Sequence, residues 1–260
     1  VGLLIGKMKG KDKEKLINDV VSSKINILVG THALLQENVK FRDLGLVIID
    51  EQHRFGVGHR KQIMDKGYNP DILSMTATPI PRTLAITIHG DMDVSIIDEL
   101  PKNRPSIKTK VVSEHDIDSI YELMKDEMKS GRQCFIVYPI IEESEKLDLK
   151  AAMTAYKKLN KGVFKDFTIG YIDGRIKKED RDIEMKKFLN NEIQCIVSTT
   201  VIEVGIDIPN ATVMLIENAD RFGLSQLHQL RGRIGRGNKT SYCFLGKSKE
   251  ESTERLKILE

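Results

Sequence analysis

No stretch of the sequence is apolar over the length that a membrane span needs, and its first residues lack the pattern of a signal peptide. Low-complexity tracts are absent as well, while 40% of the 260 residues are hydrophobic and 30% are charged. This composition is typical of a soluble globular chain with room for one large or two ordinary domains. It argues against a membrane partner.

Cysteine and net charge are both scarce. Cys134, Cys195 and Cys243 are widely spaced, and each lies in an apolar, strand-like run, which favours buried free thiols over disulfides or metal ligands. We therefore expect a reducing, cytoplasmic setting. The net charge is only +3, so the chain is no polycation, and any site for nucleic acid has to be local.

Strand and helix patterns alternate in two series, which predicts an α/β fold with parallel sheets and right-handed crossovers. The first series occupies residues 1–100, prolines mark a linker over 101–108, and 109–260 form a second, doubly wound domain. The chain begins inside the apolar segment Val1–Ile5 without a Met, so we interpret it as a fragment of a longer protein whose first domain is truncated.

Two glycine-containing segments come close to the pattern of a phosphate-binding loop. Gly2–Met8 is one residue short and has Met where a hydroxyl must reach Mg²⁺, and Gly232–Thr240 has an Asn between its last Gly and its Lys. We interpret both as chance matches. If the protein has such a loop, it lies before Val1.

The clearest catalytic signal is a pair of acids, Asp50 and Glu51, directly after the apolar run Val47–Ile49. Such a run predicts a buried parallel strand, and open α/β sheets bind ligands at the carboxyl ends of their strands. In nucleotide triphosphatases an Asp there holds Mg²⁺, and a neighbouring acid can position the attacking water. The alternative is a strand that simply ends at a polar turn.

Hydroxyl groups follow the next predicted strand, Asp71–Met75. Thr76 and Thr78 could bond a phosphate, a water molecule or a neighbouring acid. Pro79 and Pro81 fix the turn that comes after them, and a rigid strand-to-helix loop is the alternative interpretation.

The second domain carries one candidate site after its β-branched strand, in residues 198–207. Gly205 permits close approach of the backbone, and Asp207 could accept hydrogen bonds from a ribose or a neighbouring arginine. A generic loop would explain the glycine but not the spaced acids, Glu203 and Asp207.

A second candidate site in this domain contains Arg233 and Arg236, which would project from one face of a helix. Gly232 and Gly235 are unexpected there, since each costs about 1 kcal/mol relative to Ala in a helix. Arginines suit the charge of a phosphoryl-transfer transition state, where an arginine finger is worth about 10³–10⁵ in rate. A solvated basic face or a contact with a nucleic-acid backbone are the alternatives. Together with the acids of the first domain, these arginines predict an ATP-binding cleft that the two domains share.

At this point four segments, in order, resemble the motifs of superfamily-two helicases: Asp50–His53, Thr76–Thr78, Val201–Asp207 and Gln229–Arg236. Longer segments are similar to the RecG family of branch-migrating DNA helicases, namely Asp50–Val57, Met75–Leu84, Pro139–Leu147 and Glu217–Arg233. Transcription-repair coupling translocases share part of this pattern and are the alternative. The pair Gln52-His53 and the segment 142–147 favour the RecG family.

The resemblance implies two RecA-like parallel-sheet domains in tandem that use ATP and Mg²⁺ to move as a monomer on forked DNA and Holliday junctions. Asp50 would hold Mg²⁺ through water, and Glu51 would orient or activate the attacking water. The other implied nucleotide contacts and coupling residues are Gln52, His53, Thr76, Thr78, Gly205, Asp207, Gln229, Arg233 and Arg236. The implied contacts with the DNA backbone are Thr31, His32, Arg175 and Thr199, although Asp173 stands where the family pattern has His.

Both the family's wedge domain and its phosphate loop are missing from the sequence, so we expect this fragment alone not to hydrolyse ATP measurably. An RNA-unwinding enzyme of the same architecture is disfavoured, because its Asp-Glu-Ala-Asp motif is replaced by Asp-Glu-Gln-His. A non-enzymatic phosphate-binding or scaffolding module is a further alternative, which would leave the paired arginines without a purpose.

Overall fold

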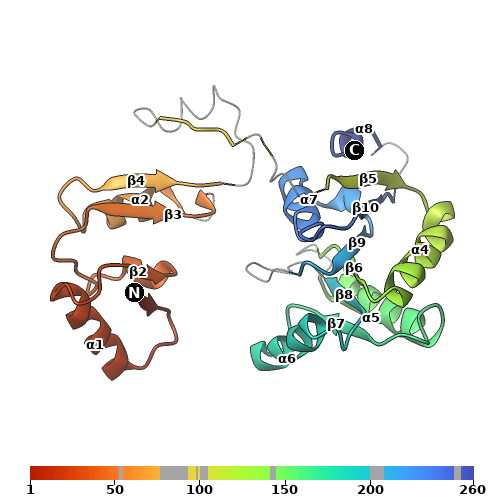
Figure 1. Cartoon of the computed structure of the whole chain (residues 1–260), viewed down its shortest axis with the longest axis horizontal. Coiled ribbons are helices and arrows are strands. Elements are labelled where there is room, and N and C mark those ends of the chain that lie inside the picture. The colour runs from red at the N-terminus through yellow and green to blue at the C-terminus, as the bar shows by residue number, and fades with distance from the viewer. Residues whose placement is uncertain are drawn as a thin grey trace. The chain divides into compact units, whose positions relative to one another are not determined.

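The computed structural model describes residues 1–52, 55–76, 93–97, 99, 105–140, 145–199, 208–248 and 253–260. The chain divides into two compact units, Val1–Gly90 and Asp91–Glu260 (Figure 1). Each unit has hydrophobic clusters of its own. The predicted linker lies partly outside the described residues.

The first unit is built from two strand–helix–strand repeats. Its elements are β1 (Gly2–Leu4), α1 (Gly10–Val21), β2 (Leu28–Gly30), the 3-10 helix η1 (His32–Leu35), β3 (Leu46–Ile49), α2 (Val57–Met64) and β4 (Asp71–Ser74). β1 pairs with β2 and β3 pairs with β4, both in parallel. The two parallel pairs, each joined through a helix, agree with the predicted α/β class.

The strands of the first unit bury only one face within the described residues. In β3, Val47 and Ile49 are buried, whereas Leu46 and Ile48 are 55% and 57% exposed. The predicted buried strand is therefore buried on one face only: alternate side chains point to opposite faces of the strand, and only Val47 and Ile49 pack against Ile63 of α2. The apolar side chains exposed on these strands are Leu3, Val29, Leu46, Ile48 and Leu73.

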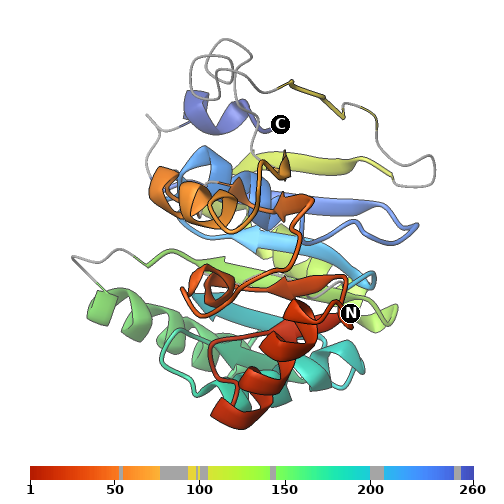
Figure 2. The same cartoon turned by 90° about the vertical axis from the view of Figure 1, so that its left-hand side faces the viewer.

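The second unit contains one six-stranded sheet, all of whose pairings are parallel. Its elements are β5 (Ile107–Val112), η3 (Glu114–Asp116), α4 (Ile117–Lys129), β6 (Gln133–Tyr138), α5 (Glu145–Lys161), β7 (Ile169–Ile172), α6 (Lys178–Leu189), β8 (Cys195–Thr199), β9 (Ala211–Ile216), η5 (Ala219–Arg221), α7 (Leu224–Arg231), β10 (Ser241–Gly246) and α8 (Thr253–Lys257). The strand order is β5-β10-β9-β6-β8-β7 (Figures 1 and 2).

Helices cover both faces of this sheet, so its central strands are buried on both sides. On one face, Met124 of α4 packs with Cys134 and Ile136 of β6. On the other face, Phe188 of α6 packs with Phe135, with ring centroids 5.0 Å apart. Continuous apolar runs are what a doubly covered parallel sheet requires. The α/β fold class with two tandem parallel-sheet domains is thus confirmed.

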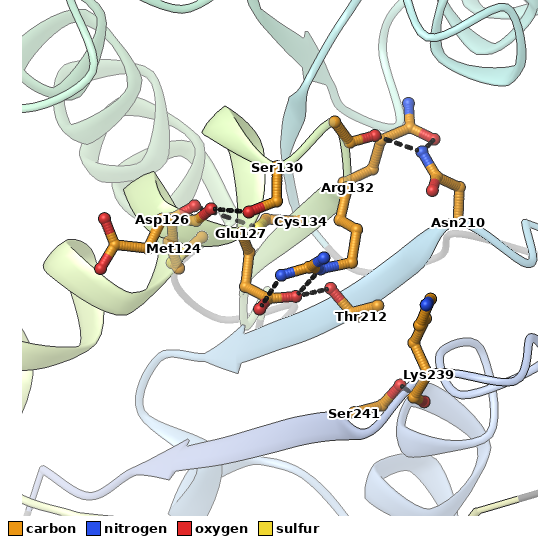
Figure 3. A network of polar contacts seen from close by, with 12 residues as sticks. Met124, Asp126, Glu127, Ser130, Arg132, Cys134, Asn210, Thr212, Lys239 and Ser241 are labelled. Carbon is orange, nitrogen blue, oxygen red and sulfur yellow. Dashed lines mark hydrogen bonds and ion pairs between the residues drawn. The ribbon is translucent and has the colours of Figure 1, made fainter.

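A polar network joins the amino ends of β6 and β9 to the end of α4 (Figure 3). Arg132 donates through Nη2 to Glu127 Oε1 at 2.6 Å, and Thr212 Oγ1 donates to Glu127 Oε2 at 2.6 Å. Beside them, Asn210 Nδ2 donates to the carbonyl of Gly131 at 2.9 Å. This network lies at the edge opposite the carboxyl ends of the strands, where ligands bind in such sheets, and it holds the sheet together there.

The three cysteines are buried and free, as the sequence predicts. Burial raises the pKa of Cys134 and Cys195 and raises the pKa of Cys243 to about 12, so these thiols stay protonated at neutral pH. In the described part of the chain, no helix is both long and apolar enough to cross a membrane.

Candidate functional site

The acid pair of the first unit lies at the carboxyl end of β3. Asp50 is exposed, and its Oδ1 accepts a hydrogen bond of 2.8 Å from the backbone N–H of Glu51. Glu51 has a φ of +50°, in the left-handed region that disfavours residues with a side chain by about 1–2 kcal/mol. The chain therefore turns sharply where β3 ends and leaves the Asp50 carboxylate open to solvent.

Backbone hydrogen bonds tie this acid pair to the neighbouring strand end. The N–H of Met75 donates to the carbonyl of Ile49 at 2.8 Å, and the N–H of Gln52 donates to the carbonyl of Met75 at 3.1 Å. Since Thr76 follows Met75 directly, the acid motif and the hydroxyl motif begin at the same edge of one parallel strand pair. This is the edge at which such sheets bind ligands.

A cavity of about 760 Å³ in the first unit adjoins the same place. It is lined by residues of β2 and β3 and by residues that follow these strands, among them Thr31, Asp50 and Phe55. His32, next to Thr31, stacks its ring on Phe55 with the centroids 4.5 Å apart. The structure thus brings residues predicted to contact DNA and the residue predicted to hold Mg²⁺ into one neighbourhood.

The arginines of the second unit are not on a common helix. α7 ends at Arg231, and Gly232 is its C-cap, so Gln229 lies within the helix while Arg233 and Arg236 follow it. Arg236 is held instead by its own Nε, which donates to the carbonyl of Gly232 at 3.0 Å. The prediction of a shared helical face is therefore wrong.

The glycines that seemed costly in a helix have a simpler explanation. Gly232 ends the helix, and Gly235 has a φ of +67°, which favours glycine. A Cβ at position 235 would also come within 2.8 Å of Ile107 Cγ1. The segment 232–236 is therefore a tight turn packed against β5, and its arginines are presented by a loop.

Two further predicted DNA contacts lie at the carboxyl edge of the six-stranded sheet. Asp173 Oδ1 accepts hydrogen bonds from the backbone N–H groups of Arg175 at 2.9 Å and of Ile176 at 3.1 Å. Asp173, found where the family pattern has His, thus shapes the turn that carries Arg175, which is exposed. Thr199 ends β8 and is fully buried.

Glu217, at the carboxyl end of β9, is a functional candidate that the sequence reasoning missed. Burial, with a smaller contribution from Glu114, raises the pKa of Glu217 above its usual range. The carboxylate in turn contributes, after burial, to the raised pKa of Tyr138 at the end of β6. Its position within a recognisable motif was a signal, but its burial could not be read from the sequence.

The donor set of the first unit fits Mg²⁺. This ion is usually held through one or two carboxylates together with phosphates and water, rather than by an all-protein cage. Within the described residues no cluster of three or more His, Cys, Asp and Glu could hold a metal, whereas Asp50 offers a single exposed carboxylate. His53, Thr78, Gly205 and Asp207 lie outside the described residues.

Two protein-family models match the chain, one in each part. "DEAD/DEAH box helicase" matches residues 1–86, and "Helicase conserved C-terminal domain" matches residues 115–238. The first domain of the pair therefore contains the acid motif, and the second contains the arginine loop.

Curated relatives and a solved structure are similar over the whole length. The chain is 52% identical to "ATP-dependent DNA helicase RecG" of Synechocystis sp. over 100% of this chain and 32% of that protein. It is 51% identical to the protein of the same name from Thermotoga maritima, over 99% and 33%. The solved "Structure of RecG bound to three-way DNA junction" is 47% identical with a TM-score of 0.75, over 99% of this chain and 33% of that one. The chain thus spans about a third of the length of these relatives.

Proposed function

Since the chain belongs to the RecG family of helicases, we propose that it is the motor segment of an ATP-dependent DNA helicase that acts on branched DNA. The observation that carries this proposal is the strand edge where Asp50, Glu51 and Gln52 follow β3. There the N–H of Gln52 donates to the carbonyl of Met75, which precedes Thr76. A strand-tip carboxylate beside hydroxyls is the arrangement that binds Mg²⁺ and positions water in nucleotide triphosphatases.

Each predicted residue receives a role within this proposal. Asp50 holds Mg²⁺ through water, and the bound ion neutralises charge on the phosphates. Glu51 orients or activates the attacking water. Arg233 and Arg236 stabilise the negative charge that spreads over the transferred phosphoryl group, with Gln229 beside them. The proposed coupling and cleft residues are Gln52, His53, Thr76, Thr78, Gly205 and Asp207.

The proposed partner is branched DNA, gripped through its phosphate backbone. Contacts with phosphates position a protein without reading sequence, which is what movement along DNA requires. We assign these contacts to Thr31 and His32 in the first unit and to Arg175 in the second, and we assign none to Thr199, which is fully buried. Support comes from the relative solved with a three-way DNA junction. We further propose that the full-length protein works as a monomer in the cytoplasm.

The test is ATP hydrolysis by the full-length protein in the presence of forked DNA, duplex DNA or RNA. We expect forked DNA to stimulate most. Asp50→Asn should abolish hydrolysis, and Arg236→Ala should abolish turnover while most ATP binding is kept, because an arginine finger acts mainly in the transition state. Asp166→Asn and Arg181→Ala, which change residues outside the proposed site, are the matched controls.

Two results would contradict the proposal. Undiminished turnover of the Asp50→Asn and Arg236→Ala variants would contradict the proposed roles of these residues in ATP hydrolysis. Equal stimulation by RNA and forked DNA would contradict the proposed substrate. Hydrolysis by this segment alone, at a rate comparable with that of the full-length protein, would contradict only the separate expectation that the segment is inactive.

A further inference from the structure

Two aromatic rings in the first unit form an ordered stack that the proposed function does not yet use. The rings of His32 and Phe55 lie 4.5 Å apart with an interplanar angle of only 6°, and His59 meets both rings edge-on. His32 is largely exposed, and Phe55 is partly buried. The stack therefore joins a surface residue after β2 to a residue that follows the acid motif.

Phe55 is fixed to the acid motif by its backbone and by its side chain. Its N–H donates to the carbonyl of Gln52 at 2.9 Å, and the N–H of Gln52 donates to Met75 at the end of β4. Its side chain packs against the buried cluster of Val47 and Ile49. A displacement of the acid motif must therefore move the Phe55 ring.

His32 is fixed in the same way to the turn that is proposed to touch DNA. The N–H of Thr31 donates to the carbonyl of Leu4 in β1, and the N–H of Leu34 donates to the carbonyl of Thr31 at 2.9 Å. Ala33, next to His32, is buried. The imidazole thus cannot move far without Thr31, and Thr31 lines the same cavity as Asp50 and Phe55.

We propose that the stack of Phe55 on His32 is a positioning device that couples the nucleotide-binding acids to the DNA-contacting turn at Thr31. This inference rests on the proposed function, since it presumes that the acids act on ATP and that the turn acts on DNA. The continuous path runs from Thr76 and Met75 through Gln52 and Phe55 to His32. A coupling path needs a measured coupling energy, and substitution of Phe55 removes the stack without changing a residue assigned to either site.

The first experiment removes the ring of Phe55 in the full-length protein. We expect Phe55→Leu to leave DNA-free ATP hydrolysis and the dissociation constant for forked DNA within about twofold of wild type. The kcat at saturating forked DNA should fall about tenfold, within the usual range of coupling between sites. Tyr68→Leu removes a fully exposed aromatic ring of the same unit and should change none of these quantities.

A variant that keeps an aromatic ring at position 55 distinguishes a role of the stack in coupling from a role in packing. Phe55→Tyr keeps two stacked rings and should retain most of the DNA stimulation, whereas Phe55→Leu should lose it. His32 is left unchanged in these variants, because it is itself a proposed contact with DNA. Thermal unfolding of each variant confirms that it is folded.

Several results would overturn the inference. Full stimulation in Phe55→Leu would do so, and so would a loss in Phe55→Tyr as large as in Phe55→Leu, since a stacked ring at position 55 would then not be what couples the two sites. Asp50→Asn separates the two proposals. If it still hydrolyses ATP, the proposed function fails; if it is inactive while Phe55→Leu behaves as wild type, only the coupling fails.

Discussion

At the scale of single residues, Glu217 offers a pH-dependent test of burial. Because its pKa is raised in the folded protein, the charged carboxylate destabilises the fold: the stability present below the usual pKa of Glu is lost as pH rises through the raised value. We expect Glu217→Gln to raise the melting temperature at about pH 8 and to leave it unchanged at ~pH 4, where the side chain is largely neutral.

Melting curves of the purified chain at these two pH values would measure the effect of Glu217→Gln. Asp166→Asn removes a charge from an exposed residue and serves as the control. A lower melting temperature for Glu217→Gln at the higher pH would show that the carboxylate has a compensating partner.

Single residues also show where sequence reasoning stops. The acids Asp50 and Glu51 were predicted from the apolar run before them, and the structure places both at the end of β3. The left-handed backbone of Gly235 was not predicted, because a glycine in sequence shows only that it is permitted a conformation, not which one it adopts. The stack of Phe55 on His32 joins residues far apart in sequence, and no local pattern encodes it.

At the scale of elements, the network at the amino ends of β6 and β9 predicts an uneven response to two charge deletions. Burial alone would raise the pKa of Glu127, but hydrogen bonds from Arg132 and Thr212 outweigh it and hold the pKa below its usual range. Arg132→Ala leaves this carboxylate, whose side chain is only 12% exposed, without its cation. We expect a loss of about 1–3 kcal/mol in the free energy of unfolding, measured with urea.

The matched control for Arg132→Ala is Lys129→Ala, on the last turn of α4. Lys129 pairs with Asp126, but their side chains are 66% and 73% exposed, and solvent screens such a pair. The expected loss is about 0.5 kcal/mol or less. Equal losses in the two variants would mean that the Glu127 network adds nothing beyond a surface ion pair.

Elements with a strong periodicity were predicted well. In α4, Ile120, Met124 and Met128 recur every four residues in the sequence, a spacing that predicts one apolar helix face, and all three side chains are buried. The non-helical backbone of Arg233 and Arg236 was not predicted, because the hydrophobic and basic residues after Arg231 continue a helical spacing while the glycines interrupt it. The turn is decided by packing against Ile107, a contact across 128 residues of chain that only the fold reveals.

At the scale of the whole molecule, two series of alternating strands and helices predicted two tandem parallel-sheet domains. The second series gives a sheet whose central strands are covered on both faces by helices of the same unit. The first gives strands with one covered face, although their sequences are as apolar as those of the second. The composition of a strand indicates how strongly it prefers burial, but not which other element packs against it.

This contrast predicts that the two units, produced separately, differ in how cooperatively they unfold and in how much hydrophobic dye they bind. Residues 105–260 should unfold in a single cooperative transition by circular dichroism and bind little of a hydrophobic dye, because their apolar strands are enclosed. Residues 1–90 should bind the dye strongly, since Leu46 and Ile48 of β3 stay exposed, and exposed apolar surface promotes association. Replacing Ile48 by Thr, which keeps the β-branch, should reduce the dye signal of the first unit. Equal dye binding by the two pieces would mean that the exposed faces of the first unit become covered within that unit.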